Sequence, residues 1–434
     1  MGRIEISTVV KQFKGTFDEA SLNALGKATR FCRREREATP YRMLVTLVEA
    51  FAVGTLDSIA DIHRAFNALC EREVHYKPFH NQLSKSEFPI FMREALSRLF
   101  NELACEVLRF SPHSPYARFE HIRMQDGTSF ALKSALADTF PGRFTTISPA
   151  AVELHVDLDL MSEVVNRVVL SADSETERQF LPAAEDLAGE LLLGDRGYFG
   201  KDYLQSVDRA GGSFIVRGTA GMNPLILKAM GPDGREVKRF RNQRLKALKG
   251  RLSKFAWLDM TVRFDTRAEP FECRLVVHPN LRQDDTPRYL VTNLDPETFS
   301  PEQVSDGYRL RWQIELLFKE WKSHSNLRAF DTANPNIAEG LIWASLCAAT
   351  VTRYCAHITQ RITRIAISTH IVAKCIRHVL GDILYDLMHK PRRLFSRVAR
   401  AIDYLSKNAR RAHPKRDQKS GRLKLGLVHV YAGA

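Results

Sequence analysis

The sequence predicts an α/β protein in which helical regions at both ends of the chain flank a mixed sheet in the middle. Two observations in the middle of the chain predict the sheet. Residues 152–165 alternate between apolar and polar side chains, as a strand does. Residues 190–200 contain a short continuous apolar run, which is typical of a strand buried on both faces. Outside this part, long segments carry the apolar spacing of helices.

The first part of the chain is expected to be mainly helical. Residues 39–69 hold two helical apolar patterns that are separated near Gly54. This arrangement is compatible with a helix-turn-helix, but any two packed helices give the same pattern. We interpret residues 1–115 as a helical N-terminal DNA-binding domain, ending where residues 113–119 break the helical pattern.

Strands and helices follow one another in residues 116–216, which we expect to form the first part of the sheet domain. A capping-box pattern at Ser174 and Glu177 predicts the first of its helices. The expected order is three strands, a helix, a strand, a helix and a strand, at residues 119–132, 152–165, 166–173, 174–188, 190–200, 201–212 and 213–218. These segments predict a mixed five-stranded sheet with flanking helices.

The sheet pattern is interrupted and then resumes. Residues 217–285 contain Gly and Pro turns, basic residues and two strand-like segments, so we expect a β-rich basic insertion there. Residues 286–330 resume the core with a buried strand and then a long helix over residues 300–324. Residues 331–434 are expected to be a helical, basic region for DNA binding or dimerisation.

The positive charge of the chain is concentrated in two segments. The net charge is +14, of which residues 390–424 carry +11 and residues 235–254 carry +8, so that the rest of the chain carries −5. Such concentration is typical of a protein that binds a polyanion, and a nucleic acid is favoured as this partner over a membrane surface. A solvated lysine-rich tail would explain the C-terminal segment alone.

Other features of the sequence indicate a soluble protein of the cytoplasm. The longest apolar run, residues 341–351, is too short to cross a bilayer, and residues 1–13 do not resemble a signal peptide. The seven cysteines show neither C-x-x-C pairs nor zinc-ligand spacing, which fits a reducing compartment. Cys347 and Cys355 are expected to be buried in a helix.

Two aspartates follow apolar strand segments. Asp126 stands in MQDGTSF and Asp195 in LLLGDRGYFG, and glycines adjoin both positions. Ligands of open α/β sheets gather beyond the carboxyl ends of the strands, and the glycines would let the backbone turn sharply there. An ordinary Asp-Gly turn is the alternative interpretation of each aspartate alone.

A second group of polar residues stands on the helix expected at residues 300–324. In a continuous helix, the offsets of Tyr308, Arg311, Glu315 and Lys322 place all four side chains within roughly 60° of one another. The stripe is either a solvated salt-bridge ladder or one half of an active site. Together, Asp126, Asp195 and Glu315 form a carboxylate set suited to two Mg²⁺ ions about 3.5–4 Å apart.

The spacing Tyr308-x2-Arg311-x3-Glu315-x6-Lys322 matches the Y-x2-R-x3-E-x6-K signature of the insertion-sequence-four family of bacterial transposases. DGTSF is similar to the first aspartate motif of this family and GDRGYFG to the second. The resemblance covers about residues 119–327. It implies an RNase H-like core with a β-rich insertion between the second aspartate and the glutamate.

The resemblance also implies an activity and a set of site residues. Asp126, Asp195 and Glu315 would be the catalytic, metal-binding triad for two Mg²⁺ ions, with Mn²⁺ as a substitute. Tyr308, Arg311 and Lys322 would contact the DNA backbone. The implied reaction is cut-and-paste transposition of an insertion sequence, by nicking, hairpin formation and resolution, and strand transfer. Its partners would be terminal inverted repeats and target DNA, bound by a homodimer in the synaptic complex.

Several residues have alternative interpretations, and two other functions are compatible with the same motifs. Arg196 is expected either to contact DNA or, by preference, to pair with Asp195. Trp257 is expected either to stack on a flipped base or, by preference, to be a buried tryptophan of the sheet. His155, Asp157 and Asp159 are expected on a solvated or interdomain strand face. Trp312 and Trp321 are expected in the core. An RNase H-like nuclease without strand transfer, or a catalytically silent DNA-binding descendant, would share the same motifs.

Overall fold

The computed structural model describes residues 5–34, 36–54, 56–278, 287–324, 331–412 and 424–430. Its helices are α1 (Ile6–Thr16), α2 (Glu19–Ala28), α3 (Pro40–Val53), α4 (Ile59–Cys70), α5 (Tyr76–Leu83), α6 (Glu87–Glu102), α7 (Lys201–Arg209), α8 (Lys249–Leu252), α9 (Pro301–Arg309), α10 (Trp312–His324), α11 (Pro335–Thr363), α12 (Thr369–Cys375), α13 (Leu380–His389) and α14 (Leu394–Asn408). Its strands are β1 (Leu108–Phe110), β2 (Ile122–Ala131), β3 (Pro141–Phe144), β4 (Ser148–Asp159), β5 (Val165–Ala172), β6 (Leu191–Gly194), β7 (Ser213–Arg217), β8 (Leu225–Met230), β9 (Leu258–Phe264), β10 (Phe271–His278), β11 (Arg288–Thr292) and β12 (Leu427–His429).

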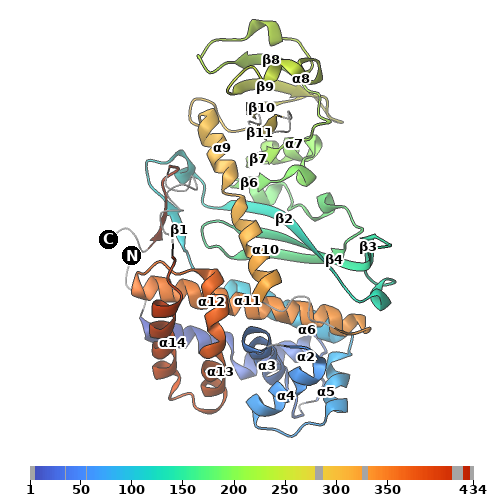
Figure 1. Cartoon of the computed structure of the whole chain (residues 1–434), viewed down its shortest axis with the longest axis vertical. Helices are drawn as coiled ribbons and strands as arrows, with labels where there is room; N and C mark the ends of the chain where they lie inside the picture. Colours follow the sequence, from blue (N-terminus) through green and yellow to red (C-terminus); the bar gives the residue numbers. More distant parts are fainter. Residues whose placement is uncertain are drawn as a thin grey trace.

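Helices from both ends of the chain form one body at one end of the molecule (Figure 1). The long helix α11 packs against α3 and α6, while α1 packs against α14 and α13 against α3. Close approach of α11 to α6 requires Gly340, because a Cβ atom there would lie 2.2 Å from the ring of Phe88. The N-terminal and C-terminal helices therefore bury their apolar faces in a shared core.

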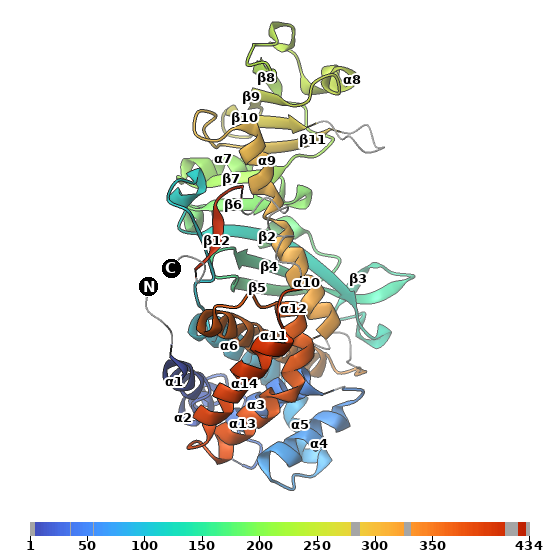
Figure 2. The ribbon, with the colours of Figure 1, turned by 60° about the vertical axis from the view of Figure 1, so that its left-hand side comes forward.

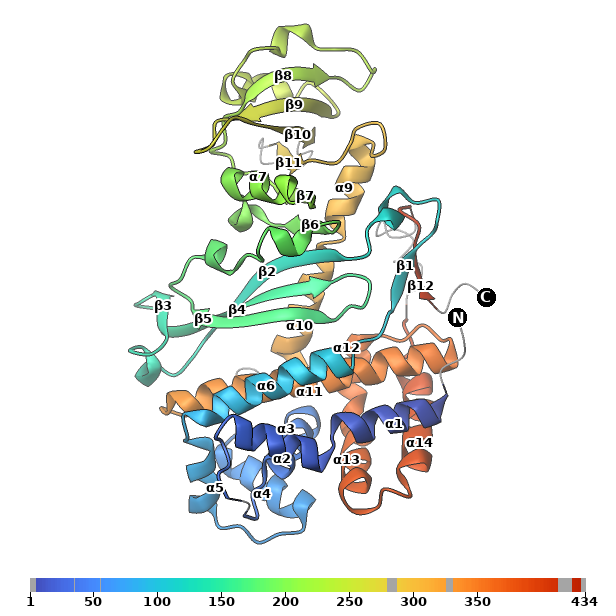
Figure 3. The same ribbon diagram turned by 180° about the vertical axis from the view of Figure 1, so that it is seen from behind.

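The main sheet of the described residues contains ten strands. Strands β5, β4 and β2 are antiparallel neighbours, and β2, β6 and β7 run parallel to one another in that order. Figure 3 shows this part of the sheet in front of α10, with α6 and α11 side by side below it. A separate two-stranded ribbon joins β1 to β12, so it links the segment before the sheet to the C-terminal part of the chain.

The expected β-rich insertion extends the same sheet. Strand β11 pairs with β7, and β10, β9 and β8 follow as antiparallel neighbours. The basic segment between β8 and β9 exposes cationic side chains, namely Arg235, Lys238, Arg239, Arg241, Arg244, Lys246, Arg251 and Lys254. Figure 2 shows β8 and α8 at the end of the molecule opposite to α14, which lies within the second basic segment.

The prediction of a helix at residues 174–188 is wrong. This segment contains only two short 3₁₀ turns, Glu177–Phe180 and Glu185–Leu187. Pro182 explains the difference, because it lacks a backbone N–H and disfavours helical geometry at the preceding Leu181. The irregular segment instead lies on the sheet, where the ring of Phe180 stacks on His155 with centroids 3.8 Å apart.

The single helix expected at residues 300–324 is divided into α9 and α10. Around the break, the N–H groups of Leu310 and Arg311 donate to the carbonyls of Gly307 and Tyr308 at 3.0 and 3.1 Å. These bonds span three residues instead of four, so the backbone tightens and the rotation per residue departs from that of an α-helix. The stripe geometry predicted for a continuous helix therefore does not hold across Arg311.

The polar face of β4 is buried, so the expectation of a solvated face is wrong. Glu153, His155, Asp157 and Asp159 are each at most 3% exposed, and the ring of Phe180 in the irregular segment after β5 covers His155. Arg123 on β2 pairs with Asp157 and Glu190 on this face. Pairing in register shows that Asp126 points to the other face of the sheet, together with Val156.

Burial of His155 predicts a loss of stability in acid. Desolvation, with a smaller contribution from Arg143 and Arg167, lowers the pKa of His155 from 6.5 to about 4. Protons therefore bind the unfolded state near pH 6.5 but the folded state only near pH 4, so stability falls as the pH drops through this window. Between pH 7.5 and 5, His155 should account for a loss of about 2 kcal/mol in unfolding free energy.

Urea unfolding at both pH values checks this prediction by comparing the wild type with His155→Gln and with a control at the exposed His113. The pH-dependent loss should shrink by about 2 kcal/mol in His155→Gln alone. An unchanged loss in that variant would contradict the assignment.

The chain shows further features that the sequence predicted. No helix within the described ranges is long and apolar enough to cross a bilayer. All seven cysteines are free, and Cys347 and Cys355 are buried in α11 as expected. Trp321 is buried, as expected, whereas Trp312 is 58% exposed and the expectation of a core position there is wrong.

Candidate active site

Strand register places the two aspartates beside each other. Gln125 of β2 pairs with Gly194 of the parallel strand β6, so Asp126 and Asp195 are the next residues on neighbouring strands. Asp126 lies within β2 and not at its end, because β2 continues as the partner of β4 after the pairing with β6 stops. Asp195 follows the last residue of β6.

Gly127 has a different role from the predicted sharp turn. It stays in the extended strand opposite His155. A Cβ atom at this position would lie 2.3 Å from the Oε1 atom of Glu153 and 3.4 Å from the hydroxyl of Tyr198. Glycine is therefore required because side chains of the opposite face approach the backbone closely.

The break between α9 and α10 brings Arg311 and Glu315 to the aspartates. Nη1 of Arg311 lies 2.7 Å from Oδ2 of Asp126, and its Nη2 pairs with Oε1 of Glu315. The Arg311 side chain is only 12% exposed, and its buried Nε has no hydrogen-bond partner. One guanidinium thus bridges the first aspartate and the glutamate of the predicted triad.

Tyr308 supplies the contact to the second aspartate. Its hydroxyl donates to Oδ1 of Asp195 at 3.2 Å. The guanidinium carbon of Arg311 lies 5.9 Å from the centre of the Tyr308 ring, within the range of a cation–π contact. Asp126, Asp195 and Glu315 therefore converge on two side chains of the Y-R-E-K spacing.

The electrostatics of Asp126 reflect this crowding of carboxylates. Burial raises the pKa of Asp126 from 3.8 to about 6, and the charges of Asp195 and Glu315 add to the rise. Arg311 and the N–H of Gly127 act in the opposite direction. The anionic site is therefore incompletely neutralised by Arg311, and a further cation would stabilise it.

The donor set fits a hard divalent cation. Carboxylate oxygens are the ligands that Mg²⁺ prefers, and a bound cation would offset both the burial and the neighbouring carboxylates that raise the pKa of Asp126. Within the ranges that the structure describes, no three His, Cys, Asp or Glu side chains are grouped closely enough to hold one ion. Arg311 lies between Asp126 and Glu315 in this arrangement.

The other predicted site residues lie farther from the triad. Lys322 is partly buried about two turns beyond Glu315 on α10. Arg196 is exposed, and the ion pair preferred for it with Asp195 is not formed among the described residues. Trp257 is partly exposed directly before β9, in the extension of the sheet.

Four residues near Tyr308 were not predicted at the site, namely Trp312, Arg217, Arg288 and Arg309. Trp312, with 58% of its surface exposed, borders a cavity of about 330 Å³ together with Arg288, Arg309 and Arg311. Arg217 of β7 pairs with Leu290 of β11, two residues from Arg288, and the charges of Arg217 and Arg309 add to the burial that lowers the pKa of Arg288. Their positions on β7, β11 and α9 are far apart in sequence, so no local motif identifies them.

Comparison with known proteins gives relatives over most of the chain. The transposase for insertion sequence element IS231E of Bacillus thuringiensis subsp. finitimus is 22% identical over 454 aligned residues, covering 95% of this chain and 93% of that protein. The transposase for IS1151 of Clostridium perfringens is 20% identical and covers 72% of this chain and 73% of its own length. A putative transposase for IS186A of Escherichia coli (strain K12) is 50% identical over 60 residues, which are 14% of this chain and 16% of that protein.

A family model assigns the central part of the chain. The model described as a transposase DDE domain matches residues 119–351, which is more than half of the chain and includes Asp126, Asp195 and Glu315. A DDE domain implies dependence on a divalent metal. The match and the relatives together show that this chain belongs to the DDE transposases of bacterial insertion sequences.

Proposed function

We propose that the protein catalyses cut-and-paste transposition by phosphoryl transfer at Asp126, Asp195 and Glu315. The observation that carries the proposal is the convergence of these three carboxylates on Arg311 and Tyr308. Two neighbouring strands and one helix supply them, from positions up to 189 residues apart in the sequence. A solvated salt-bridge ladder would not gather two strand aspartates at the helix.

Sheet topology supports an RNase H-like core within this enzyme. The order β5–β4–β2–β6–β7, with β4 antiparallel to both neighbours and the other pairs parallel, is the arrangement expected for that core. Helix α10 contacts β2 and crosses the face to which Asp126 points. Strands β8–β10 then correspond to the insertion between the second aspartate and the glutamate.

The site residues would share the work of a two-metal reaction. Asp126, Asp195 and Glu315 would hold two Mg²⁺ ions, which when bound activate the attacking oxygen and stabilise the leaving oxygen. Tyr308 fixes one oxygen of Asp195 by its hydrogen bond and so orients the carboxylate. Arg311 neutralises Asp126 and Glu315 before the ions enter, and is then available for a DNA phosphate.

The distribution of cations supports binding of long duplex DNA. Arg217, Arg288 and Arg309 lie together beside the site, where mutual repulsion favours an added phosphate. The basic segment between β8 and β9 lies at one end of the molecule, and α14 of the second basic segment lies at the other end (Figure 2). We assign the cluster to the cleaved end and the two outer segments to flanking DNA in a dimer that holds two ends together. The N-terminal helices and the region after residue 331 would contribute DNA binding and dimerisation.

A strand-transfer assay tests the proposed function. Purified protein is incubated with Mg²⁺, linear DNA that carries the inverted repeats flanking the gene, and a supercoiled target plasmid. We expect 3′ ends to be cleaved at the repeat and joined to the plasmid. Cleaved ends that never join would indicate a nuclease, and intact ends despite binding would indicate a silent copy.

Trp312 should affect the hairpin stage of the reaction. A hairpin requires sharply bent DNA, and an extruded base is stabilised by stacking on an aromatic ring. Trp312 is exposed beside Arg311, whereas Trp257 stands before β9 in the extension of the sheet. Stacking is worth about 1–3 kcal/mol per base, so Trp312→Ala should reduce hairpin formation by about 5–150-fold and leave first-strand nicking nearly unchanged.

Denaturing gels that separate nicked from hairpin ends provide the measurement, with Trp257→Ala as the matched variant. Hairpin loss in Trp257→Ala, with none in Trp312→Ala, would assign the role to Trp257 as the sequence suggested.

A further inference from the structure

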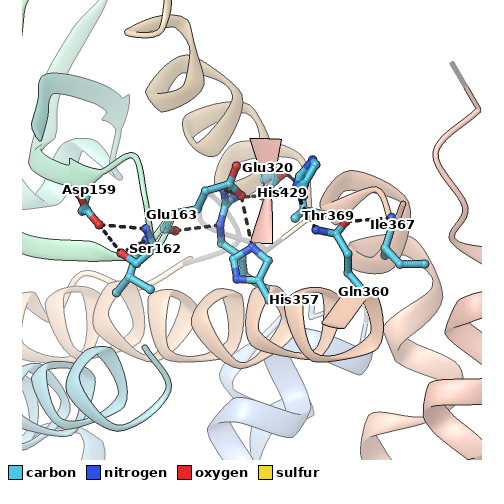
Figure 4. A network of polar contacts seen from close by, with 11 residues as sticks. Asp159, Ser162, Glu163, Glu320, His357, Gln360, Ile367, Thr369 and His429 are labelled. Carbon is cyan, nitrogen blue, oxygen red and sulfur yellow. Dashed lines mark hydrogen bonds and ion pairs between the residues drawn. The ribbon is translucent and has the colours of Figure 1, made fainter. Parts of the chain in front are cut away.

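A polar stripe runs along α11, on the side that faces the sheet. Arg353, His357 and Gln360 are four and three residues apart, so they share one face of the helix. Figure 4 shows His357 and Gln360 within a chain of contacts that reaches Glu163, Glu320, Thr369 and His429. Such a stripe is unusual in a helix whose other faces are mostly apolar and buried.

Arg353 is the central residue of this network. Its Nη1 lies 2.7 Å from Oε2 of Glu320, and its Nη2 lies 3.0 Å from Oε2 of Glu163. Its Nε also donates to the backbone carbonyl of Glu163 at 3.2 Å. All three nitrogens of one guanidinium are therefore occupied, by two carboxylates that come from different parts of the fold.

The two carboxylate partners are themselves held from a second side. Nε2 of His357 lies 3.3 Å from Oε2 of Glu163, and the hydroxyl of Thr369 at the start of α12 donates to Oε1 of Glu320. The side chains of Arg353, Glu163 and Glu320 are each only 12–15% exposed. A network with this degree of burial and pairing has one preferred geometry.

The segments that Arg353 joins are those that carry the active site. Glu320 stands on α10, five residues after Glu315, which is about 7.5 Å along the helix axis. Glu163 stands in the turn between β4 and β5, and β4 pairs along β2 through Asp126. Arg353 itself belongs to α11, whose packing against α3 and α6 anchors it in the helical body.

We propose that Arg353 is a positioning residue, which sets the place of Glu315 relative to Asp126 and Asp195 by fixing α10 against the sheet. The inference rests on the proposed function, because the position of Glu315 relative to the aspartates matters only if the three carboxylates bind metal together. Arg311 cannot fulfil this role alone, since its pairing with Glu315 must be given up when the carboxylates take up metal. Contacts behind metal ligands typically change metal affinity by about 10–100-fold when they are removed.

The experiment measures Mn²⁺ binding to the full-length protein without DNA, from the free-ion signal in electron paramagnetic resonance. Arg353→Met removes both of its ion pairs, and Glu320→Met removes the contacts of α10 with Arg353 and Thr369 while Arg353 keeps Glu163. Both variants should bind Mn²⁺ about 10–100-fold more weakly than the wild type, and Arg353→Lys should be intermediate because an ammonium cannot bridge both carboxylates as a planar fork does.

Arg397→Met is the matched control. Arg397 also bridges two carboxylates, at 2.6 Å from Asp382 and 2.9 Å from Asp386, but it joins only α13 and α14. It should lower the thermal midpoint of unfolding while leaving Mn²⁺ affinity as in the wild type. Should Arg353→Met fail to fold, Glu320→Met decides the question.

The outcomes separate this inference from the proposed function. Wild-type Mn²⁺ affinity in Glu320→Met, or an equal loss of affinity in Arg397→Met, would overturn the positioning role. The proposed function would be unaffected, because it depends on cleavage and Mn²⁺ binding by the wild-type protein. Failure of Asp126→Asn to weaken Mn²⁺ binding in the otherwise wild-type chain would overturn the proposed metal site, and the positioning role with it.

Discussion

Asp195→Asn is expected to lower the rate of DNA cleavage by about 10³-fold, the upper range for loss of one group that stabilises charge in a transition state. Asparagine keeps the size of the side chain and can still accept the hydrogen bond of Tyr308. It removes the negative charge, however, and with it much of the affinity for a hard divalent cation. Binding of the inverted-repeat duplex should change little, because a carboxylate repels phosphate and aids DNA binding only through a metal.

Cleavage of an end-labelled duplex and a gel-shift titration at the same salt concentration measure the two effects. The control is Asp186→Asn, which removes an exposed aspartate five residues before the first residue of β6, the strand that Asp195 follows. A cleavage rate near that of the wild type in Asp195→Asn would refute the assignment of the triad. Equal loss in the control would point to a general effect of charge on the reaction.

Arg311→Met should destabilise the metal-free protein by about 3–5 kcal/mol, the cost of leaving buried charges without their partner. Arg311 is 12% exposed and pairs with Asp126 and Glu315, whose carboxylates would then face Asp195 with no cation between them. A divalent ion binds the folded state of this site and should restore part of the loss. Divalent cations should therefore raise the thermal midpoint of Arg311→Met more than that of the wild type.

Denaturant unfolding in a chelator, followed by thermal unfolding across a Mn²⁺ series, gives both quantities. Arg309→Met serves as control, because Arg309 is two residues away, is 48% exposed and pairs with Asp306 of its own helix. Its loss should cost less than about 1 kcal/mol, with no added response to metal. A similar metal response in all three proteins would show that Arg311 does not occupy the space of the ions.

Much of the central fold follows from local pattern in the sequence. The alternation in residues 152–165 identifies β4, and the apolar run before Asp195 identifies β6. Burial on one face gives alternation and burial on both faces gives a continuous apolar run, so each pattern is visible within a single strand. The expected order of five strands agrees with β2, β4, β5, β6 and β7. The helix expected at residues 174–188 failed because the capping pattern at Ser174 was given more weight than Pro182.

The candidate site was predicted in part. Spacing identified Tyr308, Arg311 and Glu315 as a set, and the structure gathers them with Asp126 and Asp195. Their geometry could not be predicted, because the argument assumed an unbroken helix and the 3₁₀ bonds at Leu310 and Arg311 depend on tertiary packing. Gly127 was predicted as a turn for a similar reason, since nothing local shows that Glu153 lies against it.

The sequence by itself determined which family the chain resembles, which strands form the core, and which carboxylates and cations are candidates for chemistry. These properties depend on residue type and short spacing, which the chain carries locally. Only the tertiary structure decided that Arg311 bridges two of the carboxylates, that Arg217, Arg288 and Arg309 meet, and that Arg353 fixes α10 against the sheet. Each of these contacts joins segments far apart in the chain, and strand register and helix packing alone bring such segments together.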